Sequence, residues 1–156
     1  MIYVMDSGPL IVMFRHYYPD RFPTLWERFD EMRNDERLVS TREVSNEVNG
    51  QEDRLSTWAM ANRPFFHTPT DDELEFVAQI FAVPHFQALI RRQARLQGRP
   101  VADPFVIAKA RHCDDGCVVS TELYRQNAAK IPNVCEHFDV PHMDLETFME
   151  TENWTF

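Results

Sequence analysis

The chain has 156 residues, the size of one folded domain, and 44% of them are hydrophobic, so it can bury roughly two-thirds of its unfolded surface without disulfides or structural metals. A formal charge of -9 at pH 7 argues against broad, sequence-independent attraction to nucleic acid, because phosphates are met by basic faces. The sequence has no apolar run near about 20 residues and no basic start before an apolar leader, so we expect a single domain over residues 1–156, a cytoplasmic location and no membrane partner.

Apolar runs and amphipathic stretches alternate along the first third of the chain. Ile2–Met5 is a continuous apolar run that ends at Asp6-Ser7, before the turn residues Gly8-Pro9, and it predicts a buried strand. The pattern then predicts helices at roughly 9–17 and 22–34, a strand at 37–40, and a helix from 40 to the Asn49-Gly50 stop. Ser40-x-x-Glu43 is a capping-box pattern for this last helix.

The later part of the chain continues the alternation. Thr70-Asp71-Asp72-Glu73 predicts a helix start, and a further helical stretch is expected around 86–96. Asp103-Pro104 predicts a helix with Asp103 as its N-cap and proline in its first position. Strands are expected at 116–121 and 140–144. Short apolar strands between amphipathic helices predict an α/β fold whose central, mainly parallel sheet carries helices on both faces.

Carboxylates recur where the predicted strands end or the helices beside them begin. They are Asp6, Glu47, Asp103 and Glu122. The carboxyl ends of parallel strands face one crevice, so acids from distant parts of the chain converge there and repel one another unless a cation lies between them. Carboxylate oxygens are the ligands that Mg²⁺ and Mn²⁺ prefer, and a cation so held supports phosphodiester hydrolysis by activated water.

Each acid also has a structural interpretation. Asp103 is explained equally well as a helix cap, which does not exclude a ligand role. Glu122 fits the first turn of a helix. Glu43 is most simply the capping partner of Ser40, whereas Glu47 lies one turn later beside apolar Val44 and Val48, where an unpaired charge is costly. For Asp6, a carboxylate at the end of a predicted buried strand, exposure to solvent is the poorest explanation of the four.

Other polar groups are candidates for contact with a substrate. Ser7 and Thr121 are expected to position it. Arg91, Arg92, Arg95 and Arg99 form a basic run that is either a solvated helix face or a set of phosphate contacts with RNA. The three cysteines, an odd number, fit a reducing compartment, and their spacing lacks the paired pattern of structural zinc sites.

The order and placement of the acids resemble the PIN-domain ribonucleases, and in particular a PIN-like group similar to VapC-type toxins (DUF4411-like). The resemblance covers nearly the whole chain. It is carried by Tyr3-Val4-Met5-Asp6-Ser7, by the Glu47 segment, by residues 102–108 around Asp103, by Val118-Val119-Ser120-Thr121-Glu122, and by the tail segments 130–135 and 140–144. Two positions depart from the family pattern, because Gly8 stands where many members have asparagine and Glu122 where many have aspartate.

This resemblance implies a three-layer α/β/α PIN-like domain with endoribonuclease activity that depends on Mg²⁺ or Mn²⁺. Asp6, Glu47 and Asp103 match the core metal-binding acids, and Glu122 matches the fourth. The resemblance further implies the toxin of a type II toxin–antitoxin pair, with RNA as substrate, a cognate antitoxin as partner and a homodimeric state. The alternative is a non-catalytic PIN-like module that binds a partner or RNA through the acidic groove. A phosphotransfer domain fits less well, because Gly8 stands where an aspartyl phosphatase needs a second acid.

Overall fold

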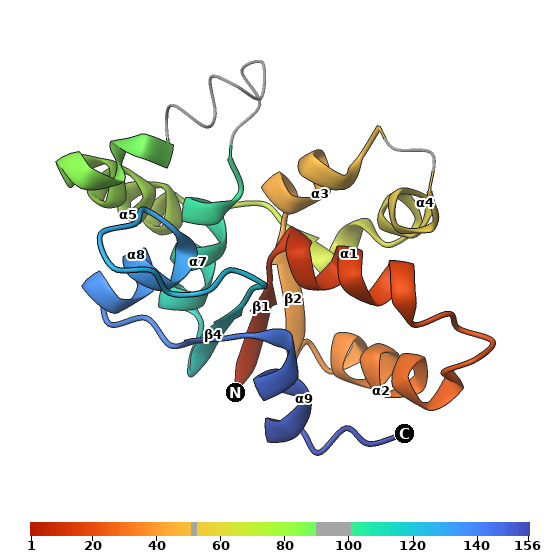
Figure 1. Cartoon of the computed structure of the whole chain (residues 1–156). Helices are drawn as coiled ribbons and strands as arrows, with labels where there is room; N and C mark the ends of the chain where they lie inside the picture. The colour runs from red at the N-terminus through yellow and green to blue at the C-terminus, as the bar shows by residue number, and fades with distance from the viewer. Residues whose placement is uncertain (51–52, 90–100) are drawn as a thin grey trace.

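A parallel β-sheet forms the centre of the protein in the computed structural model, which describes residues 1–50, 53–89 and 101–156 (Figure 1). Five strands pair in the order β3-β2-β1-β4-β5, and every pair is parallel. The strands are β1 (Ile2–Met5), β2 (Leu38–Thr41), β3 (Phe66–His67), β4 (Gly116–Val119) and β5 (His142–Met143). The predicted α/β class with a parallel sheet is confirmed.

Helices cover both faces of this sheet. In Figure 1, α5, α7 and α8 lie on one side of the central strands, and α1 and α2 lie on the other. The bounds are α1 (Ser7–His16), α2 (Pro23–Asn34), α3 (Arg42–Val48), α4 (Arg54–Ala61), α5 (Asp71–Ala82), α7 (Asp103–His112), α8 (Ile131–His137) and α9 (Leu145–Thr151), with short 3-10 turns η1 (Arg63–Phe65) and η2 (Pro84–Gln87). The architecture is therefore a three-layer α/β/α sandwich, as expected from the sequence.

The central position of β1 explains its composition. It pairs with β2 on one side, where Val4 lies opposite Val39, and with β4 on the other, where Val4 lies opposite Val118. A strand with helices above and below and strands on both sides must be apolar throughout, and residues 3–5 are fully buried. The register also brings the carboxyl ends of β1 and β4 level, because Met5 pairs with Val119.

The structure adds elements and changes the predicted start of helix α3. Strand β3 and helix α4 had no counterpart among the predicted elements. The capping box at Thr70 and Glu73 is confirmed, but the one expected at Ser40 and Glu43 was wrong. Thr41 is the N-cap of α3 and makes no side-chain cap bond, while the Ser40 hydroxyl donates to the Met5 carbonyl at 2.6 Å. Ser40 thus ties β2 to the end of β1. The stretch predicted at 86–96 lies largely outside the described residues.

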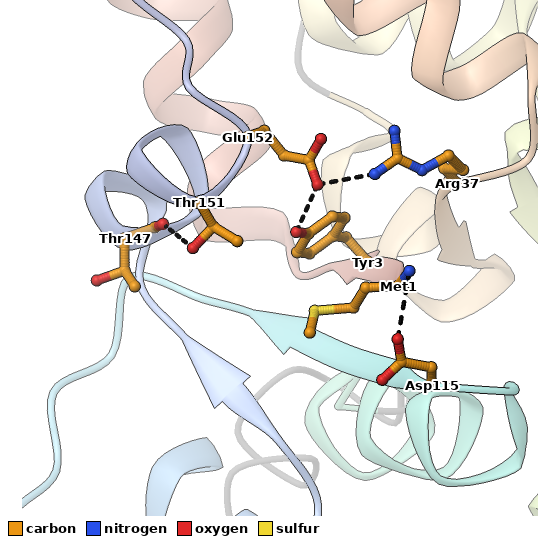
Figure 2. Close-up of polar contacts among 7 residues, drawn as sticks. All are labelled: Met1, Tyr3, Arg37, Asp115, Thr147, Thr151 and Glu152. Atoms are coloured by element: carbon orange, nitrogen blue, oxygen red, sulfur yellow. Dashed lines mark hydrogen bonds and ion pairs between the residues drawn. The ribbon is translucent and has the colours of Figure 1, made fainter.

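Helix α9 is fastened to β1 by a buried tyrosine (Figure 2). The Tyr3 hydroxyl donates to Glu152 Oε1 at 2.7 Å, and Arg37 donates to the same oxygen at 2.8 Å. Phe148 of α9 packs edge-on against the Tyr3 ring, with the ring centroids 4.7 Å apart. Burial and the bond to Glu152 raise the pKa of the Tyr3 hydroxyl, so it stays a proton donor. The last helix is therefore part of the core.

Two expectations drawn from composition can be compared with the described residues. None of the helices in residues 1–50, 53–89 and 101–156 has the length and apolar character needed to cross a bilayer. Cys113, Cys117 and Cys135 are free thiols. Burial raises the pKa of Cys117 to about 11, so its thiol is protonated at neutral pH and packs as a small apolar group.

Candidate functional site

Asp6 lies at the carboxyl end of the central strand, where the topology of the sheet places its side chain under the first turn of α1. Its backbone N–H donates to the Val119 carbonyl at 3.0 Å, which continues the pairing of β1 with β4 by one residue. Asp6 is the N-cap of α1 but makes no side-chain cap bond. Its side chain is buried, with 5% of its surface exposed, and Oδ1 has no hydrogen-bond partner among the described residues.

The surroundings of Asp6 disfavour its charged form. Burial is the largest cause of a pKa well above the ordinary range, and the neighbouring Asp103 carboxylate raises the pKa further. The nearby backbone N–H of Ser7 opposes this shift, while the charges of Glu47 and Glu122 add to it. All four acids predicted from the sequence are thus close enough to interact electrostatically at one edge of the sheet.

Asp103 begins helix α7 on the opposite face of β1. It was expected to be the N-cap, but the N-cap is Ala102, and Asp103 is the first helical residue with Pro104 after it. Asp103 is 3% exposed. A carboxylate in the first turn is stabilised by the helix dipole, so its burial beside Asp6 has partial electrostatic compensation. The capping explanation for this residue is therefore wrong in its detail, while its place in the acidic cluster agrees with the prediction.

Glu47 links helix α3 to the start of α7. Its Oε1 accepts a hydrogen bond from the Ala102 backbone N–H at 2.9 Å. The first backbone amides of a helix have no partner within the helix, so the carboxylate of Glu47 satisfies the amide directly before Asp103. Glu47 is half-buried. It therefore positions the Asp103 turn while adding its own charge to the cluster.

Glu122 lies in the connection after β4 rather than in the first turn of a helix, which corrects one interpretation of the sequence. Its Oε2 accepts from the backbone N–H of Ile131 at 2.8 Å, and its own N–H donates to the Ser120 hydroxyl at 3.3 Å. Glu122 thus joins the end of β4 to the start of α8. The two ends of segment 123–130 are therefore held together by the hydrogen bond between Glu122 and Ile131.

Of the two predicted substrate-positioning residues, Ser7 directly follows Asp6, and Thr121 follows the end of β4 that pairs with it. Ser7 is the half-buried first residue of α1, whereas Thr121 is exposed. Gly8 packs directly against Thr121, because a Cβ atom built on Gly8 overlaps Thr121 Oγ1 and lies 3.2 Å from its Cβ and Cγ2. The departure from the family pattern at position 8 therefore matches a close contact between α1 and the connection after β4.

A buried carboxylate at the same edge of the sheet was interpreted only as a cap. Glu43 in the first turn of α3 is 1% exposed. Its Oε1 pairs with Arg42 at 2.8 Å, and its Oε2 has no partner in the part of the chain described. Its position two residues after the end of β2, next to apolar Val44, was the available sequence signal.

Among residues 1–50, 53–89 and 101–156, no group of three or more His, Cys, Asp or Glu side chains is arranged to hold a metal ion. Part of the reason is that Glu47 and Glu122 each direct one carboxylate oxygen to a backbone amide. Metal binding at the acidic cluster thus stays a prediction. Its donor set fits a hard divalent cation, because it consists of carboxylates and includes a buried oxygen of Asp6 without a partner.

Two basic side chains of helix α7 have partners elsewhere in the protein. Lys109 Nζ lies 3.5 Å from Glu73 Oε1, with both side chains largely buried. Arg111 lies over the Phe76 ring, 5.8 Å from its centroid. The predicted RNA-contacting run of Arg91, Arg92, Arg95 and Arg99 lies outside the described residues.

Fold and site together define a three-layer α/β protein with a buried acidic cluster at the carboxyl edge of its parallel sheet. The chain belongs to the family described as Domain of unknown function (DUF4411), whose sequence model matches residues 3–156. No curated protein and no solved structure matches the chain.

Proposed function

We propose that this protein is a Mg²⁺- or Mn²⁺-dependent endoribonuclease that hydrolyses RNA phosphodiesters at the acidic cluster. The observation that carries the proposal is Asp6, a buried carboxylate whose Oδ1 has no hydrogen-bond partner among the described residues. Burial raises the pKa of this carboxylate, and the neighbouring Asp103 raises it further. Placing like charges together lowers the stability of the fold, and such arrangements are concentrated at functional sites. A divalent cation between the carboxylates removes this cost, because it reverses the sign of the local field.

Asp6 and Asp103 are the proposed central ligands, with Glu47 and Glu122 completing the set. When bound, the cation lowers the pKa of a water molecule and stabilises the leaving oxygen of the phosphodiester. Glu47 keeps the first turn of α7 in place through the Ala102 amide, so it positions Asp103 as well as adding charge. Glu122 restrains the connection after β4 through Ile131. Ser7 and Thr121 are proposed to orient the phosphate.

A role as the toxin of a type II toxin–antitoxin pair is a further part of the proposal. It is supported by the resemblance of the sequence to VapC-type PIN-like proteins. On this proposal the partners are RNA, a cognate antitoxin that covers the acidic groove, and a second copy of the chain. The alternative is a non-catalytic module of the same fold that binds a partner or RNA at the acidic groove.

The test compares purified wild type, Asp103→Asn and Asp30→Asn on structured and unstructured RNAs, with Mg²⁺, Mn²⁺ or EDTA. Asp30 is a matched control, because it is an acid in α2 that pairs with Arg33 at 3.2 Å. We expect cleavage by wild type and Asp30→Asn that EDTA abolishes. Losing a residue that only orients a metal ligand costs roughly 10- to 100-fold, so Asp103→Asn should lose at least that much.

Two outcomes contradict the proposal. Equal cleavage by wild type and Asp103→Asn places the activity elsewhere. No cleavage by a folded wild type that binds Mn²⁺ in calorimetry favours the non-catalytic alternative.

A further inference from the structure

A second concave site lies between η2, the connection after β4 and helix α8, and Glu122 of the acidic cluster accepts a hydrogen bond where that connection meets α8. It is a cavity of about 400 Å³. This volume lies toward the lower end of the range for small-molecule sites, roughly 300–1,000 Å³. The cavity is lined by four aromatic or imidazole rings and by three polar side chains with amide or carboxylate groups. We call this cavity the ring pocket.

The rings form a packed wall and one exposed edge. Phe86 is buried, and its ring lies edge-on to His137 at 5.2 Å and tilted against His85 at 5.7 Å between ring centroids. His85 Nε2 lies 3.0 Å from the Ala128 carbonyl, which ties η2 to the opposite wall. Tyr124, in contrast, is 54% exposed. A large exposed ring at the mouth of a ring-lined cavity provides a surface on which a flat ligand stacks.

The polar lining offers both donors and acceptors. Asn133 donates from Nδ2 to the Arg125 carbonyl at 2.7 Å, and its Oδ1 has no partner in the described residues. Asn127 and Glu136 also line the ring pocket and are exposed. Amide and carboxylate groups beside stacking rings are the combination with which proteins recognise the edge of an unpaired nucleobase.

The connection after β4 joins the ring pocket to the acidic cluster. Tyr124 and Asn127 belong to the segment 123–130, which begins and ends where Glu122 accepts from Ile131. Arg125 and Lys130 lie on the same segment, and neither forms an ion pair with a residue that the structure describes. Cationic side chains on a loop between two sites can bind the phosphates of an RNA strand that spans both sites.

We propose that the ring pocket binds one unpaired nucleobase of the RNA whose backbone lies at the acidic cluster. This inference rests on the proposed function, and it deepens it by assigning single-stranded RNA as the substrate class. A base within a duplex is stacked and paired, so it cannot enter a cavity lined by rings without being extruded. Tyr124 is a specificity-determining residue in this arrangement, since its ring stacks on the base.

Binding is measured in the Asp103→Asn protein, in which cleavage is not expected to consume the RNA. The probes are short fluorescein-labelled oligoribonucleotides, single-stranded or annealed to their complement, followed by fluorescence anisotropy. Tyr124→Ala and Asn127→Ala are compared with Tyr18→Ala, which removes another exposed tyrosine (52%) that does not line the ring pocket. Thermal unfolding verifies that each variant is folded. A parallel experiment irradiates a complex with 5-iodouridine-labelled RNA and maps the cross-linked peptide by mass spectrometry.

We expect the protein to bind the single strand in preference to the duplex. Tyr124→Ala should weaken binding by roughly 5- to 150-fold, because one base stacked on an aromatic ring contributes about 1–3 kcal/mol. Tyr18→Ala should have no effect, and the cross-link should lie at Tyr124. Equal binding by all variants, a preference for duplex, a cross-link elsewhere, or no RNA binding overturns the inference.

These results separate the two proposals. If wild type cleaves RNA with metal and Tyr124→Ala leaves its KM unchanged, the nuclease proposal stands and the ring pocket is not a base site. If no cleavage occurs but binding to single strands depends on Tyr124, the base site stands without catalysis.

Discussion

The contact between Gly8 and Thr121 predicts a substitution whose effect on stability changes sign with its partner. Gly8 is the second residue of α1, and replacing a helical glycine with alanine normally stabilises by about 0.4–1 kcal/mol. Here the added Cβ overlaps Thr121 Oγ1 and lies 3.2 Å from both Thr121 carbons. Overpacking of this kind costs about 1–3 kcal/mol. Gly8→Ala should therefore destabilise the wild type by about 1 kcal/mol.

Thr121→Ala removes the hydroxyl and the Cγ2 methyl and leaves one carbon at 3.2 Å, which a small shift accommodates. In that background Gly8→Ala should stabilise by about 0.5 kcal/mol, since only the helix preference remains. Urea denaturation of the four proteins in a double-mutant cycle measures the coupling. For a chain of this length, 1 kcal/mol corresponds to roughly 2–4 °C in Tm. Additive effects in the two backgrounds would refute the close contact.

Three further predictions concern the buried acids and the tyrosine contact. Asp6→Asn should raise the free energy of unfolding at pH 7 by about 1–3 kcal/mol, the range for an unpartnered buried polar group, while cleavage is lost. Because the folded-state pKa of Asp6 is raised, its protonated form stabilises the fold below the ordinary value of 3.8, and this contribution is lost as the pH rises through the folded pKa. The difference between wild type and Asp6→Asn in urea should thus shrink toward pH 3.8, and a difference independent of pH would contradict this account. Tyr3→Phe removes the donor to Glu152 at 2.7 Å and should cost about 1–2 kcal/mol, whereas an unchanged urea midpoint would show that this hydrogen bond does not stabilise the fold. Glu122→Ala leaves the Ile131 amide without its acceptor and should lower the free energy of unfolding by about 1 kcal/mol. Amide hydrogen exchange in α8 should become faster, and unaltered exchange there would show that Glu122 does not hold the start of this helix.

Much of the fold was predictable because the strands and helices carry strong periodic signals. Ile2–Met5 and Gly116–Val119 are continuous apolar runs, and Thr70 with Glu73 forms the expected capping box. Strand β3 has only two residues, too few for an alternating pattern, so it depends on pairing with β2 and not on its own sequence.

The placement of the acids was predictable from topology, but their individual contacts were not. Parallel strands bring Asp6 and Asp103 to one edge, where Asp103 raises the pKa of Asp6 after burial itself. Glu47, however, accepts from an amide 55 residues away along the chain, and Glu122 accepts from Ile131. Such contacts depend on how whole elements pack, which spacing along the sequence does not encode.

The position of β1 at the centre of the sheet has a consequence for biosynthesis. One of its neighbours, β4, begins at Gly116, and its tyrosine binds a glutamate 149 residues later. Strand β1 is therefore translated well before its partner β4 and waits for much of this domain before its pairing is complete, and parallel pairing over such separations is slow. Since Asp103 and Glu122 join Asp6 only through this late pairing, a nascent chain carries no assembled acidic cluster. The acidic cluster therefore assembles only after most of the domain has been translated.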